Sequence, residues 1–417
     1  MCKCFLKLAE NFAMLNFALL LLCTNCSHPE KKIETEDSGI REIDIMANLS
    51  SNRTVKLSEI ASNIEYCMLE TDKKCLIAGN SVYCSKDYVV AAGGGTSNPA
   101  FYVFERKSGS FIRQISRYGQ GPEEFTEMLY SFWDGNQEQV CVFGHNQYLF
   151  FNLDGTLSHQ ANRFKHWMDR FVSHEDLYVG YIPNRFGDAT VRIAFYDKTG
   201  ALVDSIPNCR SWKRTQTWYT GGSDSWLYVF NSNLYFKELY CDTLYQIKDF
   251  TLHSRYIFNT GGRAVPYEIQ EEGRYDFMGS LTNGGVVEDR YERYIIILKI
   301  LENNKHLYFT IEYRKQLYQA IYDKAEDKLQ IMSPVTLPQE LSKDRWKPLY
   351  GFDNDLDGGL PFWPQQMISD KEMICVYSAT ELLALDASKI TDEKLKNVLN
   401  SLEDDSNPVV AIVTLKD

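Results

Sequence analysis

A turn signature recurs along the chain after residue 100 and constrains the fold more than any other feature. An aromatic or aliphatic pair is followed by a polar break, often ending in Gly. Phe104, Phe151, Tyr196 and Tyr245 anchor four copies and are 47, 45 and 49 residues apart. This spacing is the length of a four-stranded blade and is too long for a lone hairpin. It predicts an all-β fold, a β-propeller with four-stranded blades, and the 77 residues between the anchors at 245 and 322 hold either a further blade or an insertion. The six copies are Val103–Gly109, Phe150–Gly155, Phe195–Gly200, Leu244–Asp249, Ile321–Asp327 and Leu383–Asp386.

Two runs near the chain ends are candidates for closing the ring. Ile60–Glu70 is strand-like in its second half, and Val409–Leu415 is rich in β-branched residues. Pairing these two runs in one blade would remove the open edge of the propeller. A helix is expected over Asp392–Leu402, with Thr391 as its N-cap, because its leucines and Val398 share one helical face.

The N-terminus has the layout of an export signal. Lys3 and Lys7 precede the apolar run Phe12–Leu22, which is too short to span a bilayer as a helix. The segment resembles a bacterial lipoprotein signal with Cys26 as the lipidated residue, and an ordinary secretory signal is the alternative. We therefore expect a signal peptide at 1–25, a lipidated Cys with a polar tether at 26–56 and the propeller at 57–417.

Charge and cysteine content exclude two classes of function. The chain carries a formal net charge of −12, and no run of Lys or Arg exceeds two residues, so nucleic-acid binding is not expected. Seven cysteines follow Cys26, without a CxxC pair or a His at ligand spacing. Most should be small buried hydrophobic residues, and one isolated disulfide is left open.

Three local motifs carry a resemblance to a known family. Arg117–Phe125, Cys241–Tyr245 and Asp353–Pro364 resemble segments of the six-bladed β-propeller lipoproteins of Bacteroidetes, relatives of NHL-type propellers. The resemblance extends from about Ile64 to Leu415. It implies a six-bladed propeller, export and a lipid anchor at the outer membrane, on the periplasmic or cell-surface side. It implies no established reaction.

The first candidate site lies in the Arg117–Phe125 motif, which holds two glycines and a proline. We expect an inter-blade turn there, with Phe125 in the core. The alternative is a ligand site at the pore mouth, formed by Arg117 with Glu123 or Glu124. The motif is not a phosphate loop, because it lacks the trailing Lys-Ser/Thr.

A second candidate surface interleaves aromatic rings with polar donors over residues 210–222. Trp212, Trp218 and Tyr219 are its candidate ligand-binding residues. Flat rings flanked by hydrogen-bond donors suit sugar or peptide surfaces. Packing between blades is the competing interpretation.

A third candidate is an acidic turn that resembles the first half of a calcium loop. Asp353, Asp355 and Asp357 place carboxylates at alternate positions before a Gly, but Pro364 stands where a bidentate Glu would complete the loop. We therefore expect no cofactor, with calcium as the alternative. His159, His166 and His174 are spaced too widely to predict a metal site.

These features favour a non-catalytic binding or scaffolding lipoprotein of the cell envelope. Its partner would be a glycan, a peptide or an envelope protein, and a lipid anchor would hold it at the membrane. The alternative is an envelope hydrolase or lyase acting on glycans, with Glu123, Glu124 and the three aspartates as candidate acids. No Ser/His/Asp pattern supports an enzyme.

Overall fold

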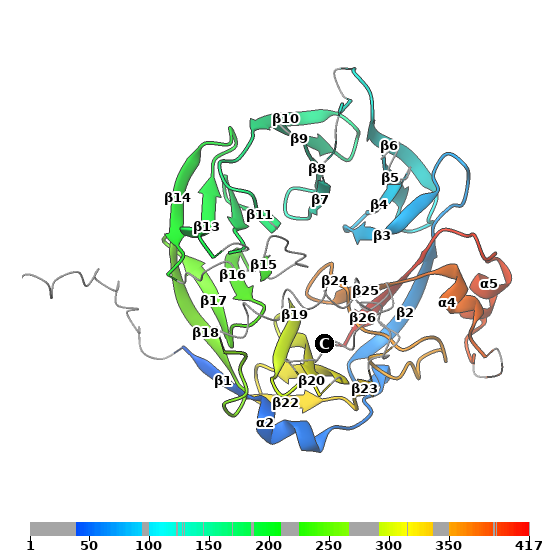
Figure 1. Cartoon of the computed structure of the whole chain (residues 1–417). Helices are drawn as coiled ribbons and strands as arrows, with labels where there is room; N and C mark the ends of the chain where they lie inside the picture. The colour runs from blue at the N-terminus through cyan, green and yellow to red at the C-terminus, as the bar shows by residue number, and fades with distance from the viewer. Residues whose placement is uncertain are drawn as a thin grey trace, which may run out of the picture. The chain divides into compact units, whose positions relative to one another are not determined.

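The computed structural model describes residues 39–93, 100–121, 124–126, 128, 130–144, 146–168, 170–184, 187–209, 225–266, 292–314, 316–336, 350–386, 388 and 390–416. The part that begins at Ile40 is one compact unit. It is an all-β propeller of six blades, each built on four antiparallel strands (Figure 1). This confirms the fold predicted from the turn spacing.

Each of the first five blades runs from its inner to its outer strand in chain order. The first blade contains β3 (Ile77–Cys84), β4 (Tyr88–Gly93), β5 (Ala100–Glu105) and β6 (Phe111–Arg117). The second contains β7 (Tyr130–Asp134), β8 (Gln139–Phe143), β9 (Gln147–Asn152) and β10 (Leu157–Asn162). The third contains β11 (Arg170–His174), β12 (Leu177–Tyr181), β13 (Val191–Tyr196) and β14 (Leu202–Pro207).

The remaining blades carry additions to this plan. The fourth contains β15 (Ser225–Phe230), β16 (Asn233–Glu238), β17 (Thr243–Lys248) and β18 (Thr251–Asn259). The fifth contains β19 (Ile296–Glu302), β20 (His306–Tyr313), β21 (Gln316–Asp323) and β22 (Lys328–Ile331), with β23 (Val335–Thr336) beside β21. The sixth contains β24 (Gln366–Met367), β25 (Glu372–Tyr377), β26 (Val409–Leu415) and β2 (Ala61–Met68).

The sixth blade closes the ring with strands from the two ends of the propeller. β2 pairs antiparallel with β26, and Ile64 lies opposite Val413 in this ladder. All but one residue of β26 are buried, because the strand lies between β2 and β25 and packs on both faces. The predicted closing pair is confirmed.

The recurring turn signature marks the third strand of a blade and the turn that follows it. Five copies fall on β5, β9, β13, β17 and β21. The sixth does not: Leu383–Asp386 lies at the end of helix α4 (Ala379–Leu383). Ser378 and Glu381 form a capping box that starts this helix, a local signal that overrides the resemblance to the other turns. The third strand of the last blade is instead β26.

A second helix, α5 (Glu393–Asn400), appears where one was expected, but its N-cap is Asp392 and not Thr391. The Asp392 carboxylate accepts hydrogen bonds from the backbone N–H groups of Lys394 and Leu395. A carboxylate at this position also interacts favourably with the helix dipole.

The segment 41–56, assigned to the tether from its sequence, contains ordered elements. β1 (Arg41–Asp44) adds a fifth, parallel strand to β18. It is followed by α2 (Ile45–Asn48), η1 (Leu49–Ser51) and then η2 (Leu57–Glu59). Ile43, Ile45 and Leu49 are buried in a cluster with residues of the fourth and fifth blades. We call residues 41–59 the strap, because they run from the fourth blade to the sixth (Figure 1).

The described cysteines form no disulfide with one another. Cys67, Cys75, Cys84, Cys141 and Cys375 are buried, as expected for small hydrophobic residues.

Candidate functional site

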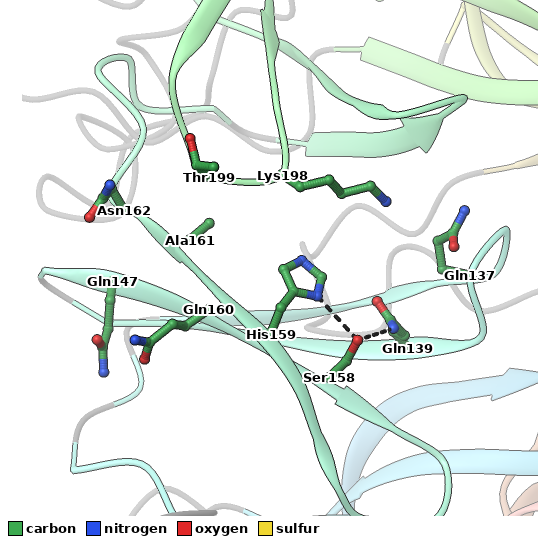
Figure 2. Close-up of a pocket in the computed structure, with 10 residues that line it drawn as sticks. All are labelled: Gln137, Gln139, Gln147, Ser158, His159, Gln160, Ala161, Asn162, Lys198 and Thr199. Carbon is green, nitrogen blue, oxygen red and sulfur yellow. Dashed lines mark hydrogen bonds between the residues drawn. The ribbon is translucent and has the colours of Figure 1, made fainter.

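A polar groove of about 640 Å³ lies between the outer strand of the second blade and the β13–β14 turn of the third blade. Figure 2 shows its lining side chains. Most are exposed and carry amide or hydroxyl groups, and none of them is Asp or Glu. The lining consists of Gln137, Gln139, Gln147, Ser158, His159, Gln160, Ala161, Asn162, Lys198 and Thr199.

One wall of the groove is β10, where exposed side chains alternate with partly or fully buried ones. The pairing with β9 shifts between Leu157 and His159, so Ser158 sits at an irregularity of the ladder. Such an irregularity re-aims the side chain that it carries. After it, His159 and Ala161 project toward the turn of the third blade (Figure 2).

The other wall is the turn after β13. The Asp197 carboxylate accepts hydrogen bonds from the backbone N–H groups of Thr199 and Ala201, which fixes the turn. Gly200 has a φ of +89°, and a Cβ there would lie 2.4 Å from the carbonyl oxygen of Asn162. The Asn162 backbone N–H donates to the Thr199 carbonyl at 2.9 Å. The turn is therefore seated directly on the end of β10.

Stacked rings lie behind His159 of the groove lining and cross the boundary between the two blades. The imidazole of His159 stacks on Phe150, with ring centres 4.4 Å apart and planes 5° apart. Phe150 stacks in turn on Tyr178 of the third blade at 4.7 Å and 12°. Phe150 and Tyr178 are fully buried. This stack holds His159 in one orientation at the groove surface.

A chain of hydrogen bonds runs through the same residues. Gln139 Nε2 donates to Asn152 Oδ1 at 3.0 Å and to Ser158 Oγ at 2.9 Å. Ser158 Oγ lies 3.1 Å from His159 Nδ1, and His159 Nε2 lies 2.6 Å from the Tyr178 hydroxyl. Each of these side chains is thus fixed by at least one hydrogen bond to another member of the chain.

The buried hydroxyl of Tyr178 decides the direction of this chain. Among the described residues, His159 is the hydrogen-bond partner of the Tyr178 hydroxyl. A buried O–H without an acceptor is costly, so we assign Tyr178 as the donor and His159 Nε2 as the acceptor. Neutral His159 then carries its proton on Nδ1 and donates to Ser158 Oγ. Burial and the charge of Lys198 lower the pKa of His159, which favours this neutral form.

This assignment fixes the role of Ser158. Its oxygen accepts from both Gln139 and His159, and no described residue accepts its own proton. The Ser158 side chain is exposed in the groove. Its hydroxyl is therefore oriented to donate to a bound molecule.

Lys198 supplies the one positive charge of the lining. Its ammonium nitrogen lies 5.1 Å from the centre of the Tyr178 ring, a cation–π distance. Among the described residues, no carboxylate lies within ion-pair distance of it. Lys198 does act electrostatically on Asp134, whose carboxylate is buried and accepts from the Ser173 hydroxyl at 2.8 Å. Its side chain extends toward the Gln137 end of the groove (Figure 2).

The described part of the Arg117–Phe125 motif lies between the first and second blades, and none of its residues lines this groove. Glu124 Oε2 accepts a hydrogen bond from the Gly121 N–H at 2.9 Å, and a Cβ on Gly119 would collide with the same carboxylate. Phe125 is buried in the core, as expected for an inter-blade turn. Arg117 is the last residue of β6, but its side chain and Glu123 lie outside what the structure describes.

Four other candidates also lie outside the described residues: Cys26, Trp212, Trp218 and Tyr219. Their assignments remain predictions from sequence.

The acidic turn is described, and its aspartates have separate partners. Asp353 pairs through its backbone with Val55 and Leu57, and Asp355 accepts from the Ser58 N–H and hydroxyl at 3.0 and 2.7 Å. Asp357 is buried and accepts from the Gly359 N–H at 2.8 Å. Burial raises the pKa of Asp357. Two of these aspartates hold the strap, and within the described ranges no three His, Cys, Asp or Glu side chains are grouped to bind a metal.

Sequence reasoning missed the groove. The adjacent pair Ser158-His159 and the turn Asp197-Lys198-Thr199-Gly200 were visible, but they are 40 residues apart in the chain. Their proximity depends on how the third blade packs against the second. Local patterns do not encode that packing.

Comparisons place the chain among proteins without a known activity. The family described as "Domain of unknown function (DUF4934)" matches residues 40–414. The fold is similar to that of a "Putative exported protein" from Bacteroides fragilis NCTC 9343, with 17% identity, 91% of this chain and 100% of that chain covered, and a TM-score of 0.60. It is also similar to a member of the duf4221 family from Bacteroides vulgatus ATCC 8482, with 12% identity, 88% and 99% covered, and a TM-score of 0.50.

At these identities the likeness shows the propeller fold alone. A comparison with curated proteins finds no match. No helix within the described ranges is long and apolar enough to cross a membrane.

Proposed function

The chain belongs to the DUF4934 family, and we propose that it is a non-catalytic lipoprotein of the bacterial cell envelope that binds a glycan in the groove between its second and third blades. The observation that carries this proposal is the groove itself. Its walls are fixed by a ring stack and a hydrogen-bond chain, while the exposed side-chain amides of Gln137, Gln147, Gln160 and Asn162 make no hydrogen bond to another described residue. A rigid base with free polar groups needs little reorganisation to bind.

The chemistry of the lining supports binding over hydrolysis. Glycosidic cleavage ordinarily uses two carboxyl groups on either side of the bond, and the lining residues include neither Asp nor Glu. Ser158 and His159 are adjacent, but with the proton on Nδ1 the imidazole donates to Ser158 and does not take its proton. Amide side chains each offer a donor and an acceptor, which matches neighbouring sugar hydroxyls.

The envelope location rests on the N-terminal sequence. Cys26 follows an apolar run and precedes a polar stretch, and the strap begins at Arg41. We expect Cys26→Ser to release the protein from membranes into the soluble fraction. Membrane association equal to that of the wild type would rule out Cys26 as the anchor.

Binding can be tested on the full-length protein in detergent. Native mass spectrometry against neutral and acidic oligosaccharides of four to six sugars would identify ligands, and titration calorimetry would give their affinities. The variant Gln137→Ala/Gln160→Ala removes two exposed lining amides. Because each hydrogen bond contributes about 1 kcal/mol, we expect its affinity to fall at least tenfold.

The matched control is Asn397→Ala, an exposed amide on α5 in the sixth blade. It should bind like the wild type. Equal losses in both variants, or no saccharide binding by the wild type at millimolar concentration, would contradict the proposal.

A further inference from the structure

We propose that the groove selects a saccharide that bears a carboxylate, such as a uronate-containing oligosaccharide, and that Ser158 and Lys198 receive that carboxylate. This inference rests on the proposed function and specifies its ligand class. It follows from the direction of the hydrogen-bond chain, the position of Lys198 and the absence of acids from the lining.

The first step of the argument concerns the Ser158 hydroxyl, a hydrogen-bond donor of fixed direction. Ser158 Oγ accepts from Gln139 Nε2 at 2.9 Å and from His159 Nδ1 at 3.1 Å, so its proton is directed to the ligand. A serine that already accepts two hydrogen bonds is a better donor than an isolated one, because hydrogen bonds in a chain polarise one another. Its best partner is an anionic oxygen.

The second step is the cation. Lys198 comes from the facing wall, and its charge acts on the His159 ring, which places it near the same part of the groove. It rests on the Tyr178 ring and pairs with no described carboxylate. In a chain of net charge −12, a groove whose one charged lining residue is a lysine is locally suited to an anion.

The third step of the argument favours a saccharide over a peptide as the ligand. A peptide would most readily add to the edge of β10, but the turn of the third blade is already bonded there, through the Asn162 N–H and the Thr199 carbonyl. A peptide would also need pockets for apolar side chains, and Ala161 is the one aliphatic residue among those that line the groove. The exposed amides of the second blade, with Thr199 on the facing turn, instead match a chain of hydroxyl groups.

The test compares one ligand in two charge states. A tetragalacturonate and its carboxyl-reduced, neutral counterpart are titrated into the full-length wild type, Lys198→Gln, Ser158→Ala and Lys107→Gln. Lys107 is the control, because it is exposed and precedes Ser-Gly in the equivalent turn of the first blade, as Lys198 precedes Thr-Gly.

We expect the wild type and Lys107→Gln to prefer the acidic form at least tenfold, and to lose part of that preference at high salt. Lys198→Gln should bind both forms alike, with its affinity for the neutral form unchanged. Ser158→Ala should weaken the acidic form more than the neutral one. For each variant, the affinity for the acidic oligosaccharide is compared with its affinity for the neutral one. A folding defect would weaken the binding of both oligosaccharides and would be recognised in this way.

Three results would overturn the inference. Equal binding of both forms by the wild type would remove the carboxylate preference while leaving glycan binding in the groove intact. A preference that survives in Lys198→Gln would place the carboxylate elsewhere. Stronger binding of a tetraglutamate peptide than of the tetragalacturonate would assign the groove to acidic peptides. Failure of the wild type to bind any saccharide is a different outcome, and it contradicts the proposed function itself.

Discussion

The Tyr178 hydroxyl lies 2.6 Å from Nε2 of His159, although the two residues belong to different blades. Tyr178 is on β12 of the third blade, and His159 is on the outer strand of the second. The contact adds to the ring packing and the other hydrogen bonds that join the two sheets, and it sets the tautomer on which the polarity of the groove depends.

This pair predicts a pH dependence of stability. Burial lowers the pKa of His159 in the folded protein, so the unfolded chain binds its proton more readily. The free energy of unfolding should therefore fall as pH decreases below the unfolded pKa of about 6.5, and level off below the folded pKa. The fall should be smaller in His159→Gln, which does not titrate and can still accept from Tyr178.

Urea unfolding at pH 7.5, 6.5 and 5.5 measures this difference. His166 and His306 also have lowered pKa values, so the comparison is between variant and wild type at each pH and not across pH alone. An identical pH profile in both proteins would contradict the assigned environment of His159.

The strap predicts a large stability effect from a residue close to the tether. Ile43 is buried in β1 with residues of the fourth and fifth blades. Ile43→Ala should lower the free energy of unfolding by about 2–5 kcal/mol, the usual range for a buried Ile-to-Ala change. Ile33→Ala, in the predicted tether, is the control and should change it little. Equal stability of the two variants in urea unfolding would show that the strap does not contribute to the fold.

Ring closure predicts that the last strand is indispensable. A chain that ends at Asn407 lacks β26, which pairs with both β2 and β25. Its loss leaves two unpaired edges and removes buried residues from two core clusters. We expect no cooperative melting transition by calorimetry. A truncated protein that melts like the full-length chain would refute the closure.

Calcium should leave the protein unchanged. A site formed in the folded state would stabilise it by about 2.7 kcal/mol at a hundred times the dissociation constant. Asp355 is instead bonded to Ser58, and Asp357 is buried against Gly359. We expect equal melting temperatures in millimolar calcium and in excess chelator. A calcium-dependent rise that disappears in Asp355→Ala would identify a site at this turn.

The sequence predicted the blades because their signal is local. A third strand and its turn recur at a fixed spacing, and the β-branched run Val409–Leu415 marks the closing strand. The strap was not predicted, because its apolar residues, among them Ile43, Ile45 and Leu49, form no long run with a strand or helix period. They become ordered by packing on blades that are distant in the chain.

The candidate site was beyond sequence reasoning for the same reason. Lys198 and Ser158 are unremarkable as single residues, and they line one groove because the turn of the third blade rests on Asn162. The acidic turn shows the opposite case. Its spacing suggests an ion site, whereas Asp355 is held by Ser58 from a segment 297 residues away.

The central claim is that the groove between the second and third blades is the ligand site, and a hydrogen-exchange footprint tests it most directly. With the full-length protein saturated by the tightest-binding oligosaccharide, backbone amides in 157–162 and 197–201 should gain protection. The equivalent hairpin of the first blade, 105–110, should not change. Protection confined to another part of the chain, such as the aromatic segment 210–222, with none in β10 or the turn after β13, would contradict the account.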